Sequence, residues 1–246
     1  MKKIFIALFC CVSVVGCKKK GCTDPFATNY DSTAKKDDLS CYYNITSYAG
    51  AGVSDIDGNT YTSVVLGNGQ EWMAENLKTT KYANGDPIPN VPDGSWNSLN
   101  TGAYCWYDND NNYENPYGKL YNFYAVDDSR NVCPTGWHVP TNSEWDSLAG
   151  YTGNSGYSTN IARLKSTSLW DDDTTCCNWC CGTNESGFNA FPGGRRNVQL
   201  GYRSLNTSAY FWLSNSYIAG FSIDLHGHYL NPTDSRAGKY IRCIKD

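Results

Sequence analysis

The chain has 246 residues, a formal net charge of −4, 12 cysteines and 19 tyrosines. This acidic balance argues against a nucleic-acid partner, because proteins bind nucleic acid largely through Lys and Arg on phosphates. The length allows one large domain together with a small additional module.

The N-terminus has the three zones of a bacterial lipoprotein signal. Two lysines precede an apolar run over residues 4–15, and Gly16 and Cys17 close it. The run is shorter than the ~20 residues that span a bilayer, and its order is that of a secretory signal. We therefore expect a signal peptide over residues 1–16, lipid on Cys17, and a basic tether over residues 17–20 that contacts the lipid bilayer. The alternative is an ordinary secretory signal with an incidental cysteine.

This signal predicts a location in the cell envelope. Cys17 is followed by Lys18 and not by aspartate, so nothing here indicates retention at the inner membrane. We expect a lipid-anchored protein of the outer membrane, on its periplasmic or surface face.

A small Asp-rich module is expected over residues 21–43. Cys22 and Cys41 bracket it, and a disulfide between them is worth ~3 kcal/mol in the chain-entropy model, enough to hold a segment with little core. The stretch that begins at Gly21 resembles the short G-C-T-D-P repeats of exported proteins from Bacteroidetes-type bacteria.

The rest of the chain indicates short strands at both ends and short helices between them. An Asn-Gly turn over residues 67–70 predicts a hairpin of residues 61–66 and 71–73. Thr141 and Glu144 form a capping box, which directs Trp145 and Leu148 toward the core. Further helices are expected over residues 119–126 and 161–165, and further strands over 209–213, 221–225 and 239–244. This order predicts an α+β domain that is rich in loops, with small antiparallel sheets.

Cysteine usage predicts disulfides, because exported proteins meet an oxidising compartment. After loss of the signal and lipidation of Cys17, nine candidates remain: Cys22, Cys41, Cys105, Cys133, Cys176, Cys177, Cys180, Cys181 and Cys243. Nine is odd, so at least one is expected to be free, intermolecular or metal-bound. The cluster over residues 176–181 is interpreted as a disulfide staple, with Cys105 as a candidate partner; zinc binding and reactive thiols are the alternatives.

Several ordered motifs of residues 55–246 together resemble the Fibrobacter succinogenes major paralogous domain. They are Asp57-Gly58-Asn59-Thr60-Tyr61, the run Glu71 to Leu77, Tyr117-Gly118-Lys119-Leu120-Tyr121-Asn122, Cys133 to Thr141 with Glu144-Trp145, Gly187-Phe188-Asn189-Ala190, Pro192-Gly193-Gly194, Trp212 and Arg242-Cys243. The resemblance implies a C-type-lectin-like fold whose termini meet in a small sheet. It also implies a Cys133–Cys243 bridge, and it brings no established activity.

Oxygen ligands at alternate positions make a candidate calcium site. Asp108, Asp110, Asn112 and Glu114 have this spacing, which hard cations favour. Tyr113 replaces the glycine of an EF-hand loop, so a solvated turn is the alternative. No other cofactor is indicated.

The candidate ligand-binding residues are Trp179, Arg195, Arg196, Trp212 and Asn215. The arginines follow Pro192-Gly193-Gly194 in an expected loop and suit carboxylates or an acidic sugar, with surface ion pairs as the alternative. Trp212 and Asn215 partly resemble the calcium and sugar triplet of C-type lectins. Aromatic runs around Trp96, Tyr104 to Tyr107, Trp170 and Tyr210 to Trp212 are typical of exposed binding loops, although large aromatics are commonly core.

The sequence favours a non-catalytic binding module for a glycan or a surface protein. No G-x-S-x-G, H-E-x-x-H or Walker motif is present, so no catalytic residues are predicted. The alternatives are a structural or adhesion component of the envelope and, less favoured, an enzyme of the formylglycine-generating type.

Overall fold

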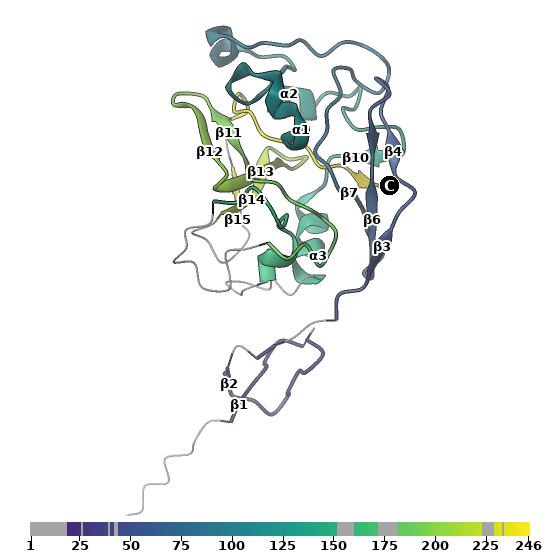
Figure 1. Ribbon diagram of the computed structural model, residues 1–246, viewed down its shortest axis with the longest axis vertical. Helices are drawn as coiled ribbons and strands as arrows, with labels where there is room; N and C mark the ends of the chain where they lie inside the picture. Colours follow the sequence, from purple (N-terminus) through teal and green to yellow (C-terminus); the bar gives the residue numbers. More distant parts are fainter. Residues whose placement is uncertain are drawn as a thin grey trace, which may run out of the picture. The chain divides into compact units, whose positions relative to one another are not determined.

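The computed structural model describes residues 19–25, 27–38, 40–41, 44–151, 160–171, 182–222, 229–232 and 234–246 (Figure 1). Cys17, the cysteine cluster 176–181 and Trp179 lie outside these residues. Contacts divide the chain into a small unit, residues 1–42, and a large unit, residues 43–246. No helix among the described residues is long and apolar enough to cross a membrane.

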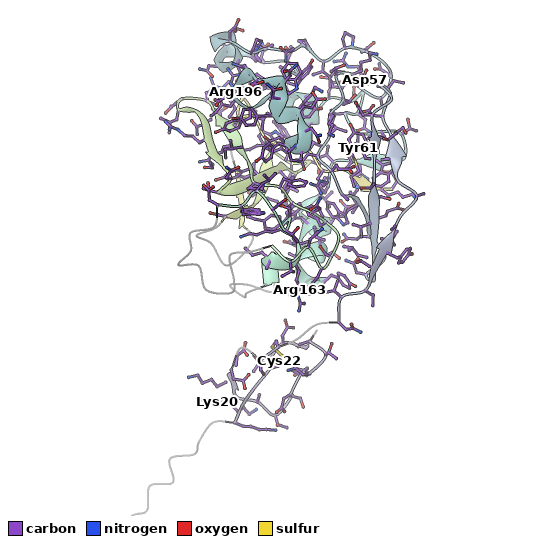
Figure 2. All side chains as sticks on the ribbon, in the orientation of Figure 1. Lys20, Cys22, Asp57, Tyr61, Arg163 and Arg196 are labelled. Carbon is purple, nitrogen blue, oxygen red and sulfur yellow. A yellow bond between two sulfur atoms is a disulfide. The ribbon has the colours of Figure 1, made fainter. Side chains whose placement is uncertain are left out.

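The small unit is held by its disulfide. Two short parallel strands, β1 (Lys20–Gly21) and β2 (Lys36–Asp37), pair beside the predicted Cys22–Cys41 bond, which is confirmed (Figure 2). Hydrogen bonds from Lys19 and Thr33 lower the pKa of Asp31, so this carboxylate is committed to its own loop.

The first sheet of the large unit joins its two ends. Its strand order is β10-β16-β7-β6-β3. The strands are β3 (Ser47–Ala49), β6 (Ser63–Leu66), β7 (Glu71–Met73), β10 (Trp137–His138) and β16 (Ile244–Lys245). The predicted hairpin is therefore confirmed as β6–β7. The expected Cys133–Cys243 disulfide is also formed, and it connects the middle of the chain to its last strand.

The second sheet has the order β12-β11-β13-β14-β15. Its strands are β11 (Gly193–Asn197), β12 (Gly201–Leu205), β13 (Ser208–Trp212), β14 (Tyr217–Ser222) and β15 (Tyr229–Pro232). The prediction of a loop for Arg195 and Arg196 was wrong, because pairing with β12 and with Gly238 makes this segment a strand despite its glycines and arginines. Two strand predictions were right over only part of their range. The strand predicted over 221–225 overlaps β14, which begins earlier, at Tyr217. The segment predicted over 239–244 is a strand only at Ile244.

Among the described residues, two small strand pairs and three short helices complete the unit. The pairs are β4 (Val53–Ser54) with β5 (Thr60–Tyr61), and β8 (Tyr104–Cys105) with β9 (Leu120–Tyr121). The helices are α1 (Glu114–Tyr117), α2 (Phe123–Val126) and α3 (Asn142–Tyr151). Four 3₁₀ turns are η1 (Gly94–Ser98), η2 (Tyr107–Asn109), η3 (Asn111–Tyr113) and η4 (Asn160–Arg163).

The helix predicted from the Thr141 and Glu144 capping box is confirmed as α3. At α3 the Glu144 side chain accepts from the Thr141 amide at 2.7 Å, and the Glu144 amide donates to the Thr141 hydroxyl at 3.3 Å. Trp145 and Leu148 are fully buried, as expected. The predicted helix over 119–126 is half wrong, because Leu120 pairs with β8 and α2 begins only after Asn122, whose side chain accepts from the Ala125 amide.

The family-like motifs meet at one buried arginine. Arg242 is fully buried and donates to Asn76 Oδ1 (2.6 Å), to the Met73 carbonyl (3.2 Å) and to the Phe188 carbonyl. Asn76 in turn donates to the carbonyl of Tyr117 at 2.7 Å. Motifs far apart in the sequence are thus joined around one guanidinium, and their shared role is to hold the scaffold.

Candidate ligand-binding site

The predicted calcium loop does not gather its four oxygen ligands. Glu114 Oε2 accepts from Lys119 Nζ at 2.7 Å and from Trp106 Nε1 at 2.6 Å, while Asp110 Oδ1 caps the Asn112 amide at 2.9 Å. Burial by itself raises the pKa of Glu114, but the bonds from Lys119 and Trp106 outweigh it and the pKa is lowered. Lys119 is buried and requires this carboxylate, so Glu114 is taken by an ion pair. No group of three or more His, Cys, Asp or Glu among the described residues is placed to hold a metal.

The aromatic runs expected to be exposed are mostly core. Trp96, Phe211 and Trp212 are fully buried. Trp212 Nε1 donates to the Tyr121 carbonyl, 2.7 Å away, inside the protein. The prediction that Trp212 binds ligand was therefore wrong, because its ring packs on Phe123 in the interior. Asn215 is exposed in the turn between β13 and β14.

Cys105 is not a partner of the cysteine cluster. Its thiol is free and fully buried next to Tyr202, whose hydroxyl lies 3.6 Å from the sulfur. Burial raises the pKa of this thiol. The proposed bridge from Cys105 is therefore absent, since the side chain lies in the core between strands.

Arg195 and Arg196 lie on opposite faces of β11. Arg196 is buried and donates to the carbonyls of Asp93 (2.7 Å) and Val91 (3.2 Å), and it lies 4.6 Å from the centre of the Trp96 ring. Its expected role in ligand binding was wrong, because all of these contacts hold the chain to itself. Arg195 is only half-buried and lies over the ring of Tyr210.

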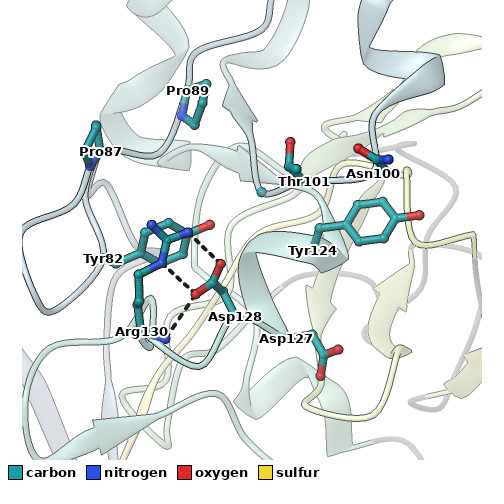
Figure 3. A pocket seen from close by; sticks show the side chains of 10 residues that line it. Tyr82, Pro87, Pro89, Asn100, Thr101, Tyr124, Asp127, Asp128 and Arg130 are labelled. Atoms are coloured by element: carbon teal, nitrogen blue, oxygen red, sulfur yellow. Dashed lines mark hydrogen bonds and ion pairs between the residues drawn. The ribbon is translucent and has the colours of Figure 1, made fainter.

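A hollow of ≈ 380 Å³ opens beside α2 (Figure 3). This volume falls in the range of about 300–1,000 Å³ that is usual for small-molecule sites. The lining residues are Tyr82, Pro87, Pro89, Asn100, Thr101, Gly102, Tyr124, Asp127, Asp128 and Arg130. We call it the Tyr124 hollow. This hollow was not predicted from the sequence, because its residues come from α2 and from separate loops, and none of them alone indicates a binding site.

One wall of the Tyr124 hollow is fixed by an ion-pair network. Arg130 donates to Asp128 at 2.7 and 2.8 Å and to Asp86 at 3.0 Å, and its guanidinium lies 4.0 Å from the centre of the Tyr82 ring. The hydrogen bonds from Arg130 lower the pKa of Asp128 to about 2. This wall therefore keeps its shape and its charge across the neutral range.

The opposite wall offers side chains that are not committed. Figure 3 shows Tyr124 beside Asn100 and Thr101, with Asp127 below them. Tyr124 is half-exposed and the other three are exposed. Within the described part of the chain, none of these four side chains has a hydrogen-bond partner. The Thr101 hydroxyl, the Asn100 amide and the Asp127 carboxylate thus remain available to a ligand. Tyr124 adds its phenol group and the face of its ring.

A second hollow of ≈ 380 Å³ contrasts with the first. Tyr48, Glu71, Glu144, Lys245 and Asp246 are among the residues that line it. Its charges are largely paired internally: Lys245 contacts Glu71 at 2.7 Å, and His138 lies 2.9 Å from Glu144 and 2.7 Å from Asp246. These groups join β10, β16 and α3 and leave less for a ligand.

The family is shown by comparison with known proteins. Residues 65–245 match the Fibrobacter succinogenes major domain, and the chain belongs to this family. No curated protein and no solved structure matches the chain.

Proposed function

We propose that the chain is an exported lipoprotein, acylated at Cys17, whose large unit is a non-catalytic binding module for a glycan. The signal and the Gly16-Cys17 step support the anchor, and two disulfides suit an oxidising compartment of the cell envelope. We assign the large unit to the C-type-lectin-like fold. The first strand of the large unit, β3, and its last strand, β16, lie in one sheet, which supports this assignment.

The Tyr124 hollow is the observation that carries the glycan proposal. A sugar ring has an apolar face that packs on an aromatic ring, and its hydroxyls need planar donors and acceptors. Tyr124 offers the face, and Asn100, Thr101 and Asp127 offer the polar groups. The Arg130 network keeps the facing wall preorganised, which reduces the entropy lost on binding.

The test is a polysaccharide and glycan panel probed with the oxidised chain from residue 18 onward. The variants are Tyr124→Ala and Asp127→Asn, and the matched control is Tyr48→Ala, an exposed tyrosine of β3 that lines the other hollow. We expect Tyr124→Ala to weaken binding about tenfold or more, a loss of about 1.4 kcal/mol. Tyr48→Ala should bind as the parent does.

A calcium chelator separates the remaining possibilities. Binding that persists in chelator and is lost in Tyr124→Ala supports the proposal. Loss on chelation in all variants would restore a calcium-dependent mode. Absence of glycan binding, with a surface protein captured instead, would contradict the proposal and favour an adhesion role.

A further inference from the structure

Three cations form a row that starts on β12, crosses β11 and ends on the neighbouring segment at Lys239. Arg195 on β11 is directly opposite Arg203 on β12, so both side chains lie on one face. Arg196 pairs with Gly238 in an antiparallel bridge. The next position of that register places Lys239 opposite Arg195. The row therefore runs Arg203, Arg195, Lys239, although like charges placed opposite each other destabilise a sheet.

Two of these cations share one aromatic ring. The Arg195 guanidinium lies 4.6 Å from the centre of the Tyr210 ring, and Lys239 Nζ lies 5.6 Å from the same centre. Lys239 Nζ is also 6.0 Å from the centre of Trp212. Aromatic faces compensate in part for lost water, but they supply no hydrogen-bond acceptor of oxygen type.

Two donors of this row have no oxygen partner in the part of the chain that the structure describes. Lys239 is only 1% exposed, and among the described residues no hydrogen bond or ion pair joins its Nζ to an oxygen. Arg195 Nε is buried and has no hydrogen-bond partner. Asp234 is the acidic side chain whose charge acts on Lys239, and it is held by Arg236 at 2.7 and 2.9 Å. Burying a cation without a partner is unfavourable, so an anion brought to this point would offset part of that cost.

We propose that Arg195 and Lys239, with Arg203 at the entrance, form a binding site for an oxyanion, the carboxylate of an acidic sugar or a sulfate group. Arg195 is half-buried and Arg203 exposed, so the ligand enters from their side. The planar fork of Arg195 suits the two oxygens of a carboxylate, and Lys239 adds a point charge at the inner end. Burial lowers the pKa of Lys239 to about 7, and a bound anion opposes that shift.

The experiment follows the Lys239 side chain by NMR in the oxidised chain from residue 18 onward, with ¹³C-labelled lysine. D-glucuronate is the probe, glucose is its neutral match, and inorganic sulfate is the third titrant. We expect a saturable shift of the Lys239 signal with glucuronate and none with glucose. A response to sulfate as well as to glucuronate assigns the site to oxyanions in general. A response to glucuronate alone assigns it to carboxylates.

Variants test the assignment of the residues. Arg195→Gln should weaken glucuronate binding by about tenfold or more, because a hydrogen bond to a charged group is lost. Arg195→Lys keeps the positive charge but loses the planar guanidinium, so it should weaken glucuronate binding less than Arg195→Gln does. The exposed Lys36, in the small unit, is the matched control, and Lys36→Met should leave the titration unchanged. A folded protein whose Lys239 signal responds to neither anion, or equally to glucose, overturns the proposal.

Discussion

The neighbouring arginines Arg195 and Arg196 lie on opposite faces of β11 and differ in whether their donors have acceptors. Arg196 donates to backbone carbonyls of the loop before η1 and stacks on Trp96, whereas Arg195 shares a ring with Lys239 and has a buried nitrogen with no acceptor. Arg242, with three acceptors on two separate segments, repeats the first arrangement. A buried cation with all its acceptors belongs to the scaffold. A buried cation without acceptors marks a place where a ligand can supply the missing acceptor atoms.

The largest effect is expected at Arg242. Arg242→Met leaves Asn76 Oδ1 and the carbonyls of Met73 and Phe188 without their donor in the core. We expect the free energy of unfolding to fall by about 3–5 kcal/mol, measured by urea unfolding of the oxidised protein. A fall in the free energy of unfolding of less than about 1 kcal/mol would show that the contacts of Arg242 do not hold the motifs together.

The next effect is expected at Arg196. Arg196→Met keeps much of the packing on Trp96 but removes the donors to Val91 and Asp93. Those carbonyls lie nearer the surface than the acceptors of Arg242, so we expect a smaller loss, about 2–3 kcal/mol, in the same urea measurement. The paired variant Arg195→Met is the control. If both substitutions destabilise equally, the contrast between the two faces does not hold.

Lys239→Met is expected to leave stability unchanged or to raise it by about 1 kcal/mol at pH 7, because an unpaired buried charge is removed. The pKa of Lys239 falls from 10.5 to about 7 on folding, so the unfolded chain binds more protons between these values. The stability of the parent protein should therefore rise with pH from about 7 to 10.5, and the variant should lack this rise. Urea midpoints across that range, in buffer free of oxyanions, give the difference.

The smallest effect is expected at His138, a half-exposed cation with two carboxylate partners. Burial lowers its pKa, but Asp246 and Glu144 outweigh burial and the net shift is upward. Its contribution is therefore present below about pH 6.5 and is lost as pH rises through the raised value. The stability difference between the parent protein and His138→Gln should be larger at pH 5.5 than at pH 8.5. A difference that does not change with pH would mean that the ring acts only by packing.

Local chemistry was predicted well from the sequence. The capping box at Thr141 and Glu144, the Asn-Gly hairpin and the Cys22–Cys41 bond each depend on residues close together in the chain. The Cys133–Cys243 bond spans 110 residues and was expected from the family resemblance, not from spacing. The half-wrong helix over 119–126 shows the limit, because Leu120 had the helical period but paired with a distant strand.

The sequence by itself determined the family, the α+β class, the two disulfides and the start of α3 at its capping box. These follow from short-range hydrogen bonds and from ordered motifs. Only the tertiary structure decided that Trp212 is core, that Glu114 belongs to Lys119, that Tyr124 faces Arg130 across a hollow, and that Arg195 stands beside Lys239. The burial of a side chain and the partners of a charged group are set where distant segments of the chain pack together. The residue type alone does not show which segments meet.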